Sequence, residues 1–144
     1  NAFLALGALA GSLLLATKNL SNNPGKLIFI SLFLWHCIML ATSIVKNKLL
    51  LSLILFLYGI AGSISMISMA VLILSIAQKH MIGRIIGIRQ LAIFTLPIGL
   101  IISGYLIDII GIVISLQVVT ISGLILTLIL TYKSKNLIMY RNNN

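Results

Sequence analysis

Residues 78–111 read QKHMIGRIIGIRQLAIFTLPIGLIISGYLIDIIG, and this stretch decides the fold. It begins with a basic segment that contains Lys79, Arg84 and Arg89. A long apolar run follows, interrupted by Pro97, and ends near Asp108, the only acidic residue of the chain. A basic segment followed by about 20 apolar residues is typical of a membrane helix preceded by its cytoplasmic loop.

The composition of the whole chain extends this interpretation. The 144 residues are 60% hydrophobic and 8% charged, with a mean hydropathy of +1.22. Soluble domains carry about 25% charged residues, so most of this surface is expected to face lipid. The net charge of +9 comes from basic residues placed between apolar runs, which does not predict a nucleic-acid partner. The single cysteine, Cys37, excludes an intrachain disulfide and a cysteine-rich metal site.

Five apolar runs have lengths near that of a membrane helix, for which about 20 residues cross the hydrocarbon core. We therefore predict an all-α, polytopic transmembrane helix bundle that forms a single domain over 1–144. Buried strands are disfavoured because runs of this length lack turn residues. The predicted spans are 2–17, 27–45, 49–77, 85–107 and 112–131, followed by a tail over 132–144.

The basic residues predict the orientation. One face of the membrane receives Lys18, Lys26, Lys79, Arg84, Arg89, Lys133, Lys135 and Arg141, and the other receives only Lys46 and Lys48. The positive-inside rule makes the first face cytoplasmic, with the N-terminal end outside and the C-terminus inside. The abundant isoleucine, lysine and asparagine are typical of AT-rich bacterial genomes, so we expect a bacterial inner membrane.

Small residues and a proline predict where helices approach or bend. Gly7 and Gly11 form a small-xxx-small pair, which predicts close helix packing or, as the alternative, homodimerisation. Pro97 removes a backbone hydrogen bond and predicts a kink in the fourth span. Gly99 and Gly104 are expected to admit a neighbouring helix at that bend.

Polar side chains within the apolar spans are candidates for function. His36 is either part of a proton relay or a neutral, hydrogen-bonded packing histidine. Tyr58, Ser63 and Met66 lie in a hydroxyl- and methionine-rich part of the third span. Such side chains line pathways for amphipathic molecules, although serines also mediate ordinary helix packing. At the outer end of the fourth span, Asp108 either pairs with a lysine of the 46–48 loop or is solvated.

No constellation in the sequence predicts an enzyme. Paired carboxylates, nucleophile–histidine–acid sets, phosphate-binding glycine loops and clusters of metal ligands are all missing from the sequence. We therefore expect no catalytic residues, no metal and no cofactor.

Three short motifs resemble one transporter family. Residues 83–87 (GRIIG), 96–99 (LPIG) and 104–111 (GYLIDIIG) are similar to the loop between helices ten and eleven, and to helix eleven, of the major facilitator superfamily. The closest likeness is to its drug and siderophore exporter branch. The resemblance implies that the five spans are helices eight to twelve, with Tyr58, Ser63 and Met66 as cavity candidates on helix ten. It also implies conformational or gating roles for Gly83, Arg84, Gly87, Pro97, Gly99, Gly104 and Asp108.

The family binds substrate between two six-helix halves. The resemblance thus implies that this chain is the C-terminal part of a transporter, and that its partners are the bilayer, the N-terminal half and a small-molecule substrate. The expected function is export of a small amphipathic compound, such as a drug or siderophore, by alternating access. The alternatives are a nutrient importer of the same fold, or a small membrane subunit or assembly factor that transports nothing.

Overall fold

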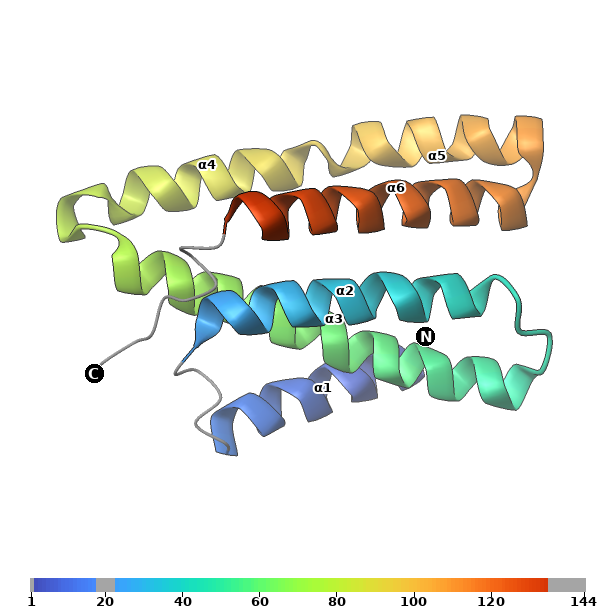
Figure 1. The fold of residues 1–144 in the computed structure, drawn as a ribbon, viewed down its shortest axis with the longest axis horizontal. Helices are drawn as coiled ribbons and strands as arrows, with labels where there is room; N and C mark the ends of the chain where they lie inside the picture. Colours follow the sequence, from blue (N-terminus) through green and yellow to red (C-terminus); the bar gives the residue numbers. More distant parts are fainter. Residues whose placement is uncertain (1, 18–22, 135–144) are drawn as a thin grey trace.

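A computed structural model describes residues 2–17 and 23–134, in which every regular element is a helix (Figure 1). The predicted all-α class is confirmed. In chain order the elements are α1 (Ala2–Thr17), α2 (Pro24–Thr42), α3 (Lys48–Ile76), the 3-10 turn η2 (Lys79–Met81), α4 (Ile82–Phe94), α5 (Leu96–Ile110) and α6 (Ile112–Lys133).

Four helical stretches of the described chain are long and apolar enough to cross a membrane. They are Pro24–Thr42, Lys48–Ile76, Lys79–Ile110 and Ile112–Lys133. The remaining apolar helix, α1, has 16 residues and is shorter than these. The lengths and compositions are those of a membrane-embedded helical protein, whereas the predicted number of five spans stays a prediction.

Local chemistry explains where the second and third helices begin. The second predicted span, 27–45, runs instead from Pro24 to Thr42. Proline suits a first helical turn because its fixed φ is helical and no N–H is needed there. At the start of α3, the Oδ1 atom of Asn47 accepts hydrogen bonds from the backbone N–H of Leu49 at 2.9 Å and of Leu50 at 3.4 Å. This side chain satisfies two N–H groups that the helix leaves unpaired.

The fourth predicted span, 85–107, is two helices that break at Thr95. Pro97 lies in the first turn of α5 and has no N–H to donate to the carbonyl of Ile93 four residues earlier. The Thr95 hydroxyl donates to the carbonyl oxygen of Ala92 at 2.6 Å and completes the break. The kink expected from Pro97 is therefore confirmed.

The segment predicted as a basic loop is mostly helical. Gly83, Arg84 and Gly87 lie within α4, because the chain reverses earlier, at η2. There the backbone N–H of Met81 donates to the carbonyl oxygen of Gln78 at 2.8 Å. Isolated glycines between isoleucine and arginine lower helix propensity by about 1 kcal/mol each, which is too little to end a helix.

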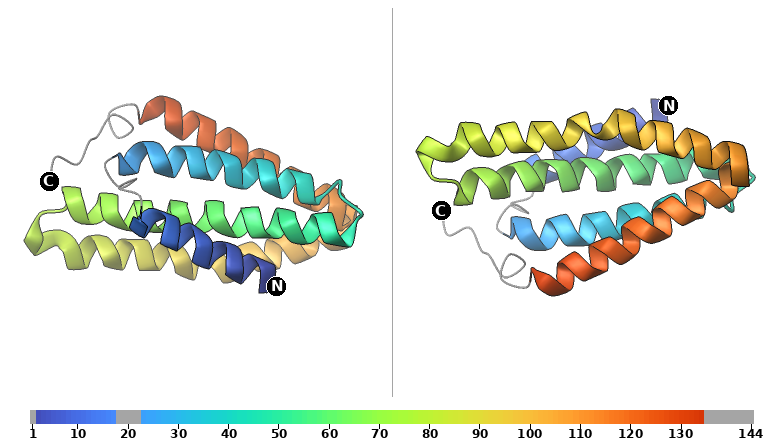
Figure 2. Two further views of the ribbon diagram at one scale, coloured as in Figure 1. Left: turned by 90° about the horizontal axis from the view of Figure 1, so that it is seen from below. Right: turned by 90° about the horizontal axis from the view of Figure 1, so that it is seen from above.

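The long helices run antiparallel to their chain neighbours, and α4 and α5 follow each other in one direction (Figure 1). α3 packs against α1 and α2, and α2 also packs against α6 (Figure 2). Gly111 alone joins α5 to α6, with φ 78° and ψ 160°, a conformation that side chains disfavour. α4 approaches α3 only weakly, and neither α4 nor α5 contains a buried residue.

Small and hydroxyl-bearing residues fill the centre of the bundle, while most of the large apolar side chains are exposed. The buried apolar side chains are Ile28, Ala61 and Leu72, whereas six serines and threonines are buried. A soluble protein has the opposite distribution. Membrane helices pack through small residues and expose leucine and isoleucine to lipid, so the packing agrees with the composition.

The closest packing joins α1 to α3. A Cβ atom added at Gly7 would lie 2.8 Å from the carbonyl carbon of Phe56, and one added at Gly11 would lie 2.8 Å from the carbonyl oxygen of Ile60. Gly59 is equally close to the backbone of α1. Close helix packing, predicted for Gly7 and Gly11, is confirmed.

Candidate functional site

Apart from Arg89, which lies inside α4, the charged residues of the described chain lie at the two ends of the bundle. Lys26, Lys79, Arg84 and Lys133 belong to helix termini at one end (left in Figure 1). Lys46, Lys48 and Asp108 belong to the other end, where α2 connects to α3 and α5 to α6. Lys18, Lys135 and Arg141 lie outside the described residues. The segregation predicted from the sequence therefore appears in space for the residues described, and the membrane orientation stays a prediction.

Asp108 is exposed near the end of α5. Although Lys46 and Lys48 share its end of the bundle, the structure records no ion pair for Asp108 among the described residues. Helix α5, which carries Asp108, packs on α6 and not on the α2–α3 connection that carries Lys46 and Lys48, which accounts for the missing ion pair. Of the two predicted alternatives, the solvated carboxylate fits this arrangement.

An aromatic cluster joins the middle of α2 to α3. The rings of Trp35 and Tyr58 stack with centroids 5.0 Å apart and planes inclined by 28°. The ring of His36 meets Trp35 edge-on, with centroids 5.4 Å apart. A Cβ atom at Gly62 would lie 3.3 Å from the Nε1 atom of Trp35, so the indole covers this glycine. Sequence reasoning identified His36 and Tyr58 but not the stacked pair, because Trp35 is paired with Tyr58 only through the register of two helices.

His36 is held as a packing histidine. Its Nδ1 atom lies 2.7 Å from the carbonyl oxygen of Leu32, one turn earlier. A carbonyl only accepts hydrogen bonds, so Nδ1 is the donor in this contact. The Nε2 atom of the same ring lies against Gly123 of α6. The packing alternative therefore has a geometric basis, and the proton relay stays a prediction.

The three candidates on α3 do not share one face. Ser63 donates its hydroxyl to the carbonyl oxygen of Ile60 at 3.0 Å and lies against Gly11, so it belongs to the interface with α1. Five residues turn a helix by about 140°, which separates Ser63 from Tyr58. Met66 is rotated by about 80° from Tyr58 and by about 60° from Ser63, and it is 59% exposed. The structure thus assigns Ser63 to packing and leaves Met66 uncovered between the directions of Tyr58 and Ser63.

The candidates on the broken helix remain apart from this cluster. A Cβ atom added at any of its four glycines would meet no atom of another element within 4 Å. The neighbouring helix expected at Gly99 and Gly104 is therefore not found among the described residues. These glycines are Gly83, Gly87, Gly99 and Gly104.

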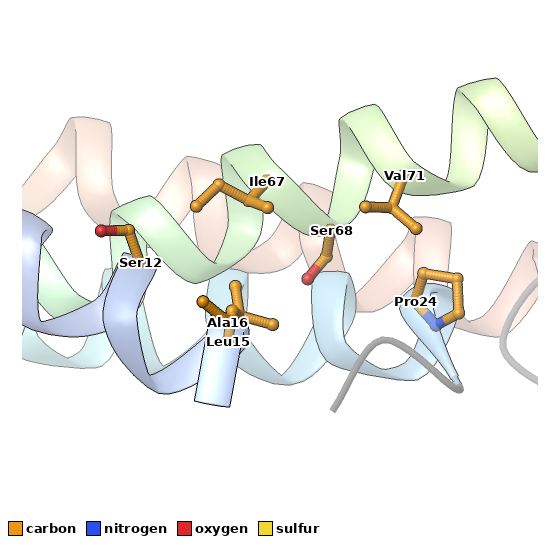
Figure 3. Close-up of a pocket in the computed structure, with 7 residues that line it drawn as sticks. All are labelled: Ser12, Leu15, Ala16, Pro24, Ile67, Ser68 and Val71. Carbon is orange, nitrogen blue, oxygen red and sulfur yellow. The ribbon is translucent and has the colours of Figure 1, made fainter. Parts of the chain in front are cut away.

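A pocket that the sequence did not reveal lies between α1, α2 and the C-terminal half of α3 (Figure 3). Ser68 lines it, with a side chain that is 2% exposed and a hydroxyl without a hydrogen-bond partner. No sequence signal separates Ser68 from the other serines of α3, because its orientation depends on where α1 and α2 pack.

The described residues contain no group of three or more histidine, cysteine, aspartate or glutamate side chains placed to hold a metal ion. Comparison with models of protein families, with curated proteins and with solved structures finds no match to this chain.

Proposed function

We propose that this chain is a membrane-embedded part of a secondary transporter that exports small amphipathic compounds by alternating access. The observation that supports the proposal most is the broken helix α4–α5, which has no buried residue although α1, α2 and α3 pack closely. Broken helices at membrane depth occur where they are buried in protein or line a water-filled cavity. Further helices or a cavity are therefore expected beside α4–α5.

The break lies at Pro97, which has no N–H for the carbonyl of Ile93, and a backbone N–H at the end of α4 donates to this carbonyl instead. The long helix is therefore interrupted within the apolar stretch Lys79–Ile110. The resemblance at 83–111 assigns the helices expected beside this break to the other half of a major facilitator transporter.

The substrate pathway would follow the side of α3 that α1 and α2 leave uncovered. Met66 and Met69 lie on this side and are 59% and 43% exposed, and Tyr58, whose ring stacks on Trp35 of α2, lies at its edge. Stacked aromatic rings and thioethers bind varied apolar and amphipathic molecules because they are polarisable and adaptable. The export direction follows from the resemblance of 83–111 to the exporter branch of the family, and a proton gradient is the expected driving force.

Water accessibility along α3 tests the proposal. We would replace Cys37 by alanine and introduce single cysteines as Met66→Cys or Leu57→Cys. These positions are nine residues apart, which is about 2.5 turns, so they lie on opposite sides of α3. Both are similarly exposed, at 59% and 51%, and both lie about 7 Å from the helix midpoint. The comparison therefore separates a pathway face from a lipid face at matched depth.

The full-length protein in its native membrane would be treated with a charged, membrane-impermeant thiol reagent. The proposal predicts that the cysteine at position 66 reacts at least about ten times faster than the one at 57, because thiolates form readily only in water. Equal rates, or faster reaction at 57, would mean that no aqueous pathway follows this face. A membrane subunit without transport activity would then be the better interpretation.

A further inference from the structure

The pocket between α1, α2 and α3 is a site that the proposed pathway does not use. Apolar side chains form most of its wall: Leu15, Ala16, Pro24, Ile67 and Val71. Its volume is about 190 Å³. Apolar cavities of about 150 Å³ in proteins bind a molecule of the size of benzene. The pocket therefore has room for one small ring.

Ser68 differs from four of the five other buried hydroxyl-bearing residues. Ser31, Ser115, Thr120 and Thr127 each donate to a carbonyl of their own helix, over 2.6 to 2.8 Å. The Ser68 hydroxyl makes no such bond, although its residue is 2% exposed. Figure 3 shows its oxygen in the space between Ala16 and Pro24. A buried hydroxyl without a partner costs about 1–3 kcal/mol, so this orientation needs a partner inside the pocket.

We propose that this pocket binds a small uncharged amphiphile that has an apolar body of one ring and a single hydrogen-bonding group. The described residues of the lining include no charged side chain, so none of them would compensate a charge on the ligand. The second hydroxyl of the lining, Ser12, already donates to the carbonyl oxygen of Leu9 at 2.7 Å. Ser68 is therefore the group that selects the ligand, and as a hydroxyl it donates to or accepts from the ligand's polar group.

The site lies on a different side of α3 from the candidate pathway. Ser68 follows Met66 by two residues, a rotation of about 200°, so the two side chains lie on nearly opposite sides of the helix. Binding at Ser68 therefore does not require transport, and it remains testable whether or not Met66 lines an aqueous pathway.

Two probes that differ by one hydroxyl test the site: 4-fluorophenol and fluorobenzene. Saturable binding to the full chain in nanodiscs of zwitterionic lipid is measured by fluorine NMR, with empty nanodiscs to subtract partitioning. The unmodified chain should bind both probes, and 4-fluorophenol more tightly. Ser68→Ala should weaken 4-fluorophenol about threefold to tenfold, the effect of one neutral hydrogen bond, and leave fluorobenzene unchanged.

Two further variants make the result specific. Ser31→Ala removes an equally buried hydroxyl that is bonded within its own helix, and it should change neither affinity. Ala16→Leu fills the pocket and should abolish binding of both probes. The proposal is overturned if no saturable binding occurs, which would leave water as the partner of Ser68. It is also overturned if Ser68→Ala binds 4-fluorophenol as tightly as the unmodified chain, or if binding survives Ala16→Leu.

Discussion

Replacing Gly7 by alanine should loosen the bundle at its closest helix contact. The added Cβ would lie 2.8 Å from the carbonyl carbon of Phe56 and 3.1 Å from its Cα. It would be closer still to the carbonyl oxygen. These are backbone atoms, so no side-chain rotation relieves the clash and α1 must move away from α3.

The size of the effect follows from the required movement. Ordinary contact begins at 3.4 Å, so raising the 2.8 Å separation to that value needs a shift of about 0.6 Å, and the closer carbonyl oxygen requires a larger one. A radial gap of 0.5–1 Å forfeits about a quarter to a half of the dispersion energy of each contact. Overpacking of this kind costs about 1–3 kcal/mol, and membrane helices depend on such contacts for association.

Gly104→Ala is the matched control. Gly104 lies inside α5, and a Cβ added there meets no atom of another element within 4 Å. Alanine is favoured over glycine in both helices by about 1 kcal/mol in water, and this gain is common to the two variants. The difference between their free energies of unfolding therefore isolates the steric cost, and Gly7→Ala should be the less stable by about 1–3 kcal/mol.

The measurement is reversible unfolding of the purified chain in mixed micelles, as the mole fraction of denaturing detergent is raised. Circular dichroism follows the helices, and the fluorescence of Trp35, the single tryptophan, follows the packing of α2 on α3. If Gly7→Ala is at least as stable as Gly104→Ala, close backbone contact between α1 and α3 does not stabilise this bundle.

Two further predictions concern stability in the same assay. Asn47→Ala should lower the free energy of unfolding by about 1 kcal/mol, because the N–H groups of Leu49 and Leu50 lose their acceptor, and no loss would show that solvent replaces the cap. A double-mutant cycle of Trp35→Leu and Tyr58→Leu, followed by circular dichroism, should give a coupling energy of about 0.5–1.5 kcal/mol for the stacked rings. Additive effects would contradict a direct contact.

Features that depend on neighbouring residues in the sequence were predictable. The apolar runs of 27–45, 49–77 and 112–131 predicted helices because helix hydrogen bonds are local. Pro97 predicted the kink for the same reason, since a missing N–H affects a carbonyl four residues away. The Gly7–Gly11 spacing predicted close packing because both residues lie on one helix face.

Features that depend on where another helix packs were not predictable. Ser63 lies on the face of α3 that packs on α1, so it does not line the candidate pathway. The sequence alone does not show which helix packs on which face of α3. The stack of Trp35 on Tyr58 and the pocket at Ser68 also arise from contacts between separate helices. Even the extent of α4 depended on a 3-10 turn at Lys79–Met81 whose residues carry no strong turn signal.

The single-residue joint at Gly111 bears on how the chain is made. A joint of one residue leaves no polar linker between α5 and α6. Without such a linker, α5 cannot cross a bilayer while α6 remains in water during synthesis. We expect the two helices to enter a membrane together as a hairpin. The turn end carries the single charge of Asp108, whereas the opposite ends of α4 and α6 carry Lys79, Arg84 and Lys133. Moving the turn end through the hydrocarbon therefore costs less free energy than moving the basic end. The orientation of the hairpin would then be determined when it inserts during synthesis.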